Sequence, residues 1–501
     1  MVILGVVFAG AVVGMGGMGY LGDIMGRERA YCLTMFFIVR NQSPATPAKL
    51  IAVRELPILK WPRVFLSSYL VFLSLQTIIL ASRFLILCGE VFPFFWFCGC
   101  NVLLLTLLLL CSAGNTAASL KVLGSLGAAV LPWGPADDTT DNSVFVILAV
   151  VRFVLGVGVG GLYPLSAVKA AESTSEGENT TTRTAKAFFW QTPGAITPYI
   201  VGWIIVQMCR NPGSNYHVFA QLEFRLLFGL GAIFPMYLLL SELRSSRGAD
   251  DSAVSTKDSQ ETIAKRSQMM KDKQNWKQLI GTGGTWFLFD IAYYGTAIFQ
   301  PQIVKCIFQP AVGDALTDDF FWHNIVVSLA GIPGVLTAIW VMKHIGARNL
   351  GLYGFLLIAF GFGALAICFQ VATDTNELKW VKFGIFCFCN FMLNCGPNIS
   401  TYVLPAVLFP FEVRSTFHGL SAGAGKIGAV VGTFMYPALA SQGNNSGGVE
   451  HGIAIVLWVQ VFFAILGALA TIFCLPDERL LAKQKKLGDT IGASIQREFA
   501  N

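Results

Sequence analysis

The sequence predicts an all-α protein that crosses a membrane many times, and three observations lead to this fold class. Hydrophobic residues make up 54% of the 501 residues and charged residues only 13%, about half the charged share of soluble domains. Phenylalanine (40 residues) and glycine (51 residues) are abundant, as in helices that face lipid and pack closely. Apolar runs of about 20 residues, the length that crosses a bilayer as a helix, recur along the chain.

The segments expected to span the membrane are 2–21, 144–170, 185–209, 221–240, 279–304, 321–343, 349–372, 379–409, 414–438 and 453–475. The first lacks a basic start and runs directly into a charged loop, so we expect a spanning helix and not a signal peptide. The net charge of +6 is explained by basic loops beside the membrane, and we expect no nucleic-acid partner. The cysteines lie mostly in apolar runs without the spacing of a metal site, so no metal or other cofactor is expected.

A long basic segment divides the spans into two groups. Residues 242–278 interleave lysine and arginine with acids and serine, which predicts a solvated, disordered linker. It separates an N-terminal helical bundle, 1–241, from a C-terminal bundle, 279–475, and a tail follows at 476–501. Two bundles with a site between them near mid-membrane are typical of a transporter.

The charges of the connecting segments predict their side of the membrane. The linker, the tail and the loop 22–30 carry basic residues. Three other connections carry no lysine or arginine: 135–142, 313–319 and 441–452. The excess of basic residues on cytoplasmic loops therefore places the linker and the tail in the cytoplasm.

Two sequence features are expected to act in conformational change. GYLGDIMGRER (19–29) joins two spans, and KHIGARN (343–349) is a degenerate second copy after the eighth span. Gly156 and Gly160 lie one turn apart on a helix that also carries Arg152, which predicts close approach of another helix. The first motif resembles the loop after helix 2 of the major facilitator superfamily. The resemblance assigns the conformational motif to Gly19, Asp23, Gly26, Arg27 and Arg152.

Four further stretches narrow the resemblance. They are GGLYPLSA (160–167), WFLFDIAYY (286–294), NCGPNISTYVLPAVLFP (394–410) and RSTFHGLSAGAGKIGAVVG (414–432). Together they resemble the phosphate:proton symporter family of that superfamily, over residues 1–39 and about 119–475. The resemblance implies two six-helix bundles and a phosphate site formed by Tyr163, Gln191, Trp286, Asp290, Tyr294, Asn398 and Lys426.

The residue chemistry agrees with an oxyanion site. Trp286, Asp290 and Tyr294 are spaced i, i+4, i+8 and form one stripe on a helix. Lys426, an ionisable group deep in a span, supplies a cation. Asp290 would repel phosphate when ionised, but it becomes a hydrogen-bond donor when protonated, so we expect it to couple proton and phosphate binding.

Structural alternatives for the same residues stay open. Asp290 and Lys426 could form a buried ion pair whose role is only to hold helices together. The aromatic residues could serve as packing or interface side chains, and Gln191 and Asn398 as hydrogen-bonding links between helices.

The chain departs from the family pattern at three places. Leu162 stands where the family has an acid before Tyr163, and Val407 where it has a glutamate. Met1 already lies inside helix 2, so helix 1 is missing from the pattern. A facilitator, or a symporter driven by another cation, therefore stays open beside the proton symporter.

Residues 40–118 match nothing in the family. Joining 29–39 directly to 122–134 restores one helix of the expected length, so we interpret 40–118 as a translated non-coding insert. The alternative is a genuine extra helical hairpin near 64–88 and 92–111.

The sequence thus predicts a multi-pass membrane protein, not an enzyme, that imports inorganic phosphate with protons by alternating access. The plasma membrane is the expected location. The alternatives are a sugar or organic-anion porter of the same fold, or a non-transporting receptor or defective paralogue.

Overall fold

The computed structural model describes residues 2–25, 143–173, 179–209, 225–226, 228–233, 260–308, 318–371 and 376–481. Every regular element that it describes in these ranges is a helix, as the sequence predicts. The predicted insert at 40–118 and most of the predicted span 221–240 lie outside the described residues.

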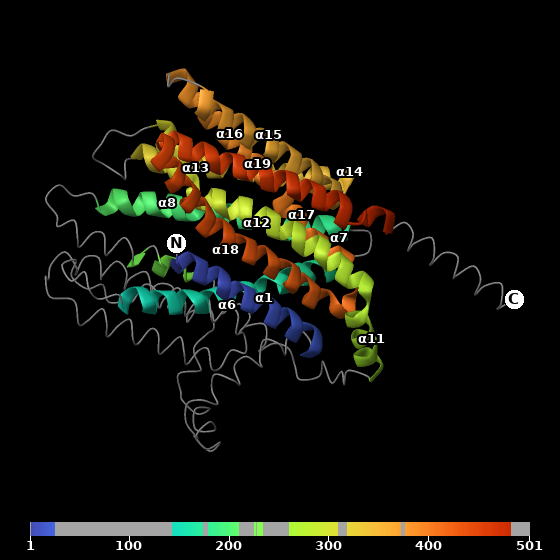
Figure 1. The fold of residues 1–501 in the computed structure, drawn as a ribbon. Coiled ribbons are helices and arrows are strands. Elements are labelled where there is room, and N and C mark those ends of the chain that lie inside the picture. Colours follow the sequence, from blue (N-terminus) through green and yellow to red (C-terminus); the bar gives the residue numbers. More distant parts are fainter. Residues whose placement is uncertain are drawn as a thin grey trace, which may run out of the picture.

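We refer to the helices before residue 241 as the N half. Its described long helices are α1 (Val2–Met25), α6 (Ser143–Glu172), α7 (Thr180–Phe188) and α8 (Gln191–Cys209). They run roughly parallel to the long axis of the bundle, with α1 and α6 along one edge (Figure 1).

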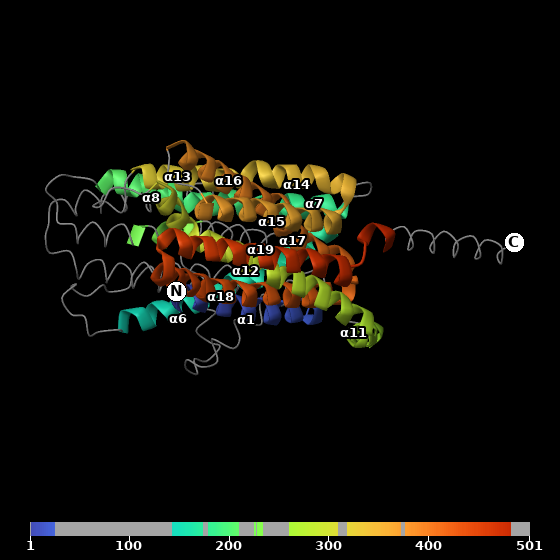
Figure 2. The same cartoon turned by 45° about the horizontal axis from the view of Figure 1, so that its top comes forward.

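The C half consists of α12, which begins at Lys273, and of the helices that follow it. They are α12 (Lys273–Phe308), α13 (Asp318–Leu329), α14 (Gly331–Ile345), α15 (Ala347–Val371), α16 (Asn376–Cys395), α17 (Pro397–Leu408), the 3-10 turn η4 (Phe411–Val413), α18 (Arg414–Gly447) and α19 (Val449–Cys474). In both views α12 and α18 run between the edge formed by α1 and the one formed by α15 and α16 (Figures 1 and 2).

Three predicted spans are each divided into two helices. The breaks fall between α7 and α8, at Ala330 between α13 and α14, and at Gly396 between α16 and α17. Pro397 begins α17 right after Gly396, and proline has no N–H to continue the hydrogen bonds of α16. The break at Gly396 thus follows from local sequence.

Small residues let α1 and α6 touch along their backbones. A Cβ atom on Gly156 would overlap the carbonyl of Val7, and one on Gly160 would overlap the carbonyl of Ala11. This confirms the predicted close approach and identifies α1 as the partner helix. On its other side α1 lies against α18, where Gly419 meets the carbonyl of Met15.

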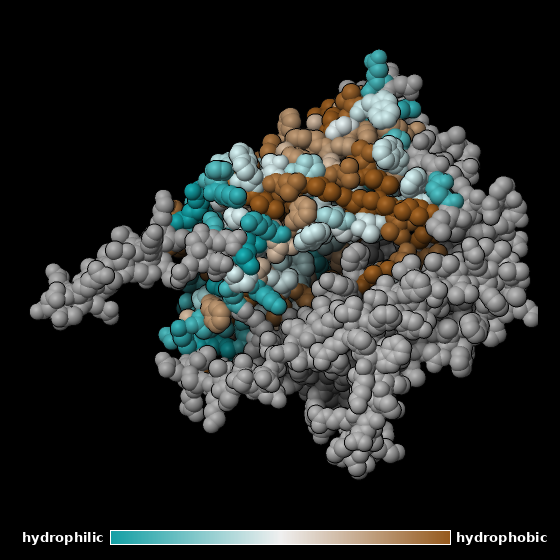
Figure 3. Space-filling view, turned by 180° about the vertical axis from the view of Figure 1, so that it is seen from behind, coloured by the Kyte–Doolittle hydropathy of each residue, from teal (hydrophilic) through white to brown (hydrophobic). Residues whose placement is uncertain are grey.

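The outer surface of the bundle is apolar. Among the described residues, five helical segments are long and apolar enough to cross a membrane. Large side chains such as Trp340 (64% exposed) and Phe473 (78% exposed) point outward from them. Figure 3 shows hydrophobic side chains over the middle of one face and hydrophilic ones gathered at its left end. This distribution fits a bundle that lipid surrounds.

The predicted disorder of the linker was wrong for residues 260–278. Gln260–Lys271 forms α11, which leads into α12 beyond the end of the bundle (Figure 1). The turn between them is held by side chains that cap the end of α11. Asn275 Nδ2 donates to the Met269 carbonyl at 2.9 Å, and Trp276 Nε1 donates to the Met270 carbonyl at 2.8 Å. These bonds satisfy carbonyls that the end of a helix leaves without partners.

Candidate functional site

Asp290 and Lys426 form a buried ion pair at the centre of the C half. Asp290 lies in the middle of α12, and Lys426 lies on the neighbouring α18. The Lys426 ammonium donates to Asp290 Oδ2 at 2.8 Å and to the Tyr294 hydroxyl at 2.8 Å. One cation thus holds two members of the predicted stripe on α12.

Aromatic rings enclose this pair. The Lys426 Nζ atom lies 4.2 Å from the centre of the Tyr294 ring and 5.8 Å from the centre of the Tyr163 ring. Tyr163, on α6 of the N half, lies 5.9 Å from the Trp286 ring. Trp286 also interacts with the Asp290 carboxylate. Five of the seven predicted site residues therefore surround one centre, and they come from both halves.

The other two predicted residues, Asn398 and Gln191, make no hydrogen bond to Asp290 or Lys426 among the described residues. Asn398 is buried on α17, and its Nδ2 donates to Asn394 Oδ1 at 3.1 Å. It also interacts with Tyr293, the neighbour of Tyr294. Gln191 begins α8, and its Oε1 atom is buried without a hydrogen-bond partner among the described residues. No hydrogen bond of the described residues joins Gln191 to the ion pair.

Sequence reasoning missed a second polar layer against Trp286. His418 is fully buried on α18, with its ring 5.7 Å from Trp286 and its Nε2 atom 3.0 Å from the Tyr402 carbonyl. The Tyr402 hydroxyl lies 3.1 Å from Ser166 Oγ across the two halves. His418 and Tyr402 both stand inside motifs that the sequence singles out. A polar residue within an apolar run was the signal that could have found them.

Two residues of the predicted conformational motif, Gly19 and Asp23, lie at one end of the bundle. Asp23, near the end of α1, accepts hydrogen bonds from Thr416 N at 2.7 Å and Thr416 Oγ1 at 2.6 Å. Gly19 packs against the Ser415 carbonyl with no room for a Cβ atom. Arg152 is not at that end: the neighbouring Phe153 packs against Gly10 of α1, and the Arg152 guanidinium lies 4.0 Å above the ring of Phe228. Gly26 and Arg27 lie outside the described residues.

The described residues offer nothing that would hold a metal ion, because no group of three His, Cys, Asp or Glu side chains comes together among them. The chemistry that the central site can perform is that of ion exchange. A buried ammonium with one carboxylate and one hydroxyl partner can release the carboxylate and accept another anion in its place.

Comparison with known proteins gives consistent results. A family model described as "Sugar (and other) transporter" matches residues 117–477. The inorganic phosphate transporter PT2 of Toxoplasma gondii is 35% identical over 330 residues, which are 65% of this chain and 54% of the relative, so the chain spans about half of that protein. The probable inorganic phosphate transporter 1-6 of Arabidopsis thaliana is 28% identical over 72% of this chain and 76% of its own length.

Solved structures show the same fold. The proton:xylose symporter XylE bound to 6-bromo-6-deoxy-D-glucose aligns with a TM-score of 0.55 and 17% identity, over 95% of this chain and 98% of that one. A D-xylose-proton symporter aligns with a TM-score of 0.54 and 14% identity, over 95% and 97% of the two chains.

Proposed function

The chain belongs to the sugar (and other) transporter family of the major facilitator superfamily, and we propose that it carries inorganic phosphate through the bilayer together with protons. It is an integral, multi-pass membrane protein and a transporter, not an enzyme. The relatives that are named inorganic phosphate transporters support phosphate as the substrate.

The observation that carries the proposal is the position of Lys426. Its ammonium is buried with Asp290 Oδ2 and the Tyr294 hydroxyl, each at 2.8 Å, and Trp286 interacts with the same carboxylate. A phosphate anion that takes the place of Asp290 on Lys426 keeps the cation paired. It also meets the Trp286 N–H and the Tyr294 hydroxyl, which are donors for an oxyanion.

Proton coupling follows from competition for one cation. An ionised Asp290 and a phosphate anion both need Lys426, and a buried carboxylate that loses its cation is costly. Protonation of Asp290 removes this cost and adds an O–H donor beside the anion. Each ligand then favours binding of the other, which is the thermodynamic content of coupled transport.

The two halves move relative to each other in this proposal. Tyr163 and Gln191 belong to residues 1–241, and the rest of the site belongs to residues 279–475. Rocking of these bundles exposes the site to either side of the membrane in turn. We place the protein in the plasma membrane, with the linker 242–278 and the tail 476–501 on the cytoplasmic side, because of their basic residues.

Substitution of the ion pair tests the proposal. In proteoliposomes, Lys426→Ala is expected to abolish uptake of radiolabelled phosphate, because it removes the cation. Asp290→Asn is expected to keep phosphate binding and to lose the weakening of binding that a rise in pH causes in the wild type, since asparagine cannot titrate.

The matched control is Lys382→Ala. Lys382 is also a buried lysine, but it pairs with Glu450 at 3.8 Å, and both residues lie outside the central cluster. Phosphate affinity should survive this change in folded protein. Wild-type affinity in Lys426→Ala would refute the phosphate site. An unaltered pH profile in Asp290→Asn would instead favour a facilitator, which the departures at Leu162 and Val407 keep in view.

A further inference from the structure

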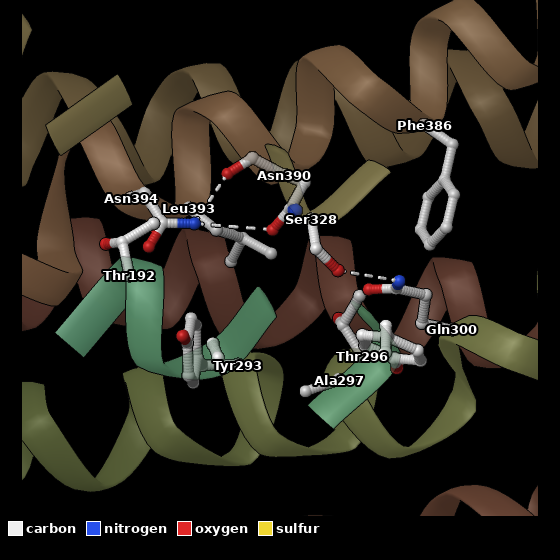
Figure 4. Close-up of a pocket in the computed structure, with 12 residues that line it drawn as sticks. Thr192, Tyr293, Thr296, Ala297, Gln300, Ser328, Phe386, Asn390, Leu393 and Asn394 are labelled. Atoms are coloured by element: carbon white, nitrogen blue, oxygen red, sulfur yellow. Dashed lines mark hydrogen bonds between the residues drawn. The ribbon is translucent and has the colours of Figure 1, made fainter. Parts of the chain in front are cut away.

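A cavity of about 130 Å³, lined by both polar and apolar side chains, lies between the two halves, beside the central site. Its wall is built from α8 of the N half and from α12, α13 and α16 of the C half (Figure 4). All of its described lining residues are uncharged, and each of the polar ones carries an amide or a hydroxyl group. These are Thr192, Tyr199, Tyr293, Thr296, Gln300, Ser328, Asn390 and Asn394.

The cavity comes nearest to the ion pair at Tyr293. The Tyr293 side chain lines the cavity, and its ring lies 5.2 Å from the ring of Tyr294, which accepts a hydrogen bond from Lys426. Along α12 the lining residues run on to Gln300, which is about 15 Å beyond Asp290 at 1.5 Å per residue. The cavity therefore lies toward the end of the bundle opposite α11.

A ladder of three asparagines runs from the cavity to Asn398, one of the predicted site residues. Asn394 Nδ2 donates to the Asn390 carbonyl at 2.9 Å, and Asn398 Nδ2 donates to Asn394 Oδ1 at 3.1 Å. The three side chains are spaced by one helical turn each across the break at Gly396. Asn390 and Asn394 line the cavity, while Asn398 contacts Tyr293.

One polar group in the wall has no partner. The Thr192 hydroxyl is buried, the residue being 3% exposed, and it lacks a hydrogen bond within the described part of the chain. Other polar groups of the wall are satisfied internally: Gln300 Nε2 donates to Ser328 Oγ and to the Asn324 carbonyl, each at 3.0 Å. A buried hydroxyl without a partner is destabilising, so this group calls for a ligand or water in the cavity.

We propose that this cavity is a docking site at which dihydrogen phosphate binds before Tyr293 admits it to Asp290 and Lys426. The inference rests on the proposed function. A singly charged phosphate has both O–H donors and acceptor oxygens, and amides and hydroxyls offer both partners. A site without a cation holds the anion weakly, as a site on a transport path must, because the substrate has to leave it again. The volume exceeds that needed for one water molecule several-fold, so the anion can keep part of its water shell.

Thr192→Val tests the docking site with little risk to the fold. Valine keeps the shape of threonine, and the hydroxyl that it removes has no internal partner to break. For the purified full chain in proteoliposomes, we expect the KM for phosphate uptake to rise about fivefold, the factor for one ordinary hydrogen bond. The equilibrium Kd for phosphate should stay at its wild-type value, because a docking step on the path changes rates but not the final bound state.

The matched control is Thr197→Val on the same helix. The Thr197 hydroxyl donates to the Pro193 carbonyl at 2.9 Å and does not line the cavity, so its KM should be that of the wild type. Ala297→Leu, which fills the cavity with side chain, should lower uptake at low phosphate by more than Thr192→Val does.

The outcomes separate this inference from the proposed function. Absence of phosphate uptake by the wild type would refute the function itself. Uptake by the wild type with an unchanged KM in both Thr192→Val and Ala297→Leu would refute the docking site and leave the cavity to water. A higher Kd in Thr192→Val, in proportion to KM, would also overturn it, since the hydroxyl would then act in the final bound state.

Discussion

A carboxylate caps the start of a helix near each copy of the loop motif, and the two caps do different work. Asp23, in the first copy of the loop motif, caps the start of α18 through Ser415 and Thr416. Glu478, just after α19, caps the start of α15 at the second copy: its Oε1 accepts from Ala347 N at 2.5 Å and Arg348 N at 3.3 Å. Both satisfy N–H groups at a helix start, where negative charge is also favoured by the helix dipole.

The difference lies in what each cap connects. Asp23 belongs to the N half and caps a helix of the C half, whereas Glu478 caps a helix of its own half. Arg348 strengthens the second cap by donating to the Leu475 carbonyl at 2.8 Å and the Ile472 carbonyl at 3.0 Å. If the halves rock, the Asp23 cap must break and the Glu478 cap need not. The same local chemistry is therefore expected to act as a latch in one copy and as a clamp in the other.

Removal of the Asp23 carboxylate should have the largest effect. Asp23→Ala deletes three hydrogen bonds between the halves, which at about 1 kcal/mol each favours opening of this end by on the order of 100-fold. Amide hydrogen exchange at Ser415 and Thr416 should accelerate, while exchange at Ala347 stays slow. Unchanged exchange at Ser415 would show that the cap is not what closes this end.

Removal of the Glu478 carboxylate should act on stability rather than on opening. Glu478→Ala is expected to cost about 1 kcal/mol, the usual value of a helix cap, and to lower the Tm of the purified protein by about 2–4 °C. Exchange should accelerate at Ala347 and Arg348 and stay unchanged at Ser415. Faster exchange at both helix starts would contradict the distinction between latch and clamp.

Much of the site could be predicted because it depends on local spacing. The period of the helix places Trp286, Asp290 and Tyr294 on one face whatever the rest of the chain does. The partnership of Asp290 with Lys426 needed more, since the two residues lie 136 positions apart and meet only where α12 packs on α18. Resemblance to a family supplied that step.

The sequence did not predict contacts that arise only from packing. Tyr402 and Ser166 meet across the two halves, and the unpartnered Thr192 hydroxyl is visible only once α8 packs against its neighbours. The linker error has the same cause. Composition predicts that a charged segment stays solvated, but in α11 Lys265 and Arg266 found partners at η4 that no local pattern reveals.

The smallest effect is expected at the contact between α11 and η4, which lies at the same end as the Asp23 cap. Lys265 Nζ lies 2.7 Å from Glu412 Oε1, and Arg266 Nε donates to the Glu412 carbonyl at 3.3 Å. The hydrogen bond from Lys265 holds the pKa of Glu412 below its ordinary value of 4.5, and the charge of Arg414 acts in the same direction. The ionised form of Glu412 is therefore favoured when α11 is docked.

The sign of the pH dependence follows from that direction. Docking of α11 lowers the pKa of the Glu412 carboxylate, so this group stabilises the docked state fully at pH values above its ordinary pKa of 4.5. The stabilisation is lost as the pH falls through the lower pKa that the group has in the docked state. Lys265 is 57% exposed, so water and salt screen the pair and its contribution should be at most about 0.5 kcal/mol.

The backbone amides of α11 should thus be slightly less protected from hydrogen exchange below pH 4.5 than at neutral pH. In Glu412→Gln that difference should vanish, and high salt should reduce it in the wild type. If α11 loses protection equally in both proteins, the pair does not dock α11, and the carbonyl contact of Arg266 is left to hold it.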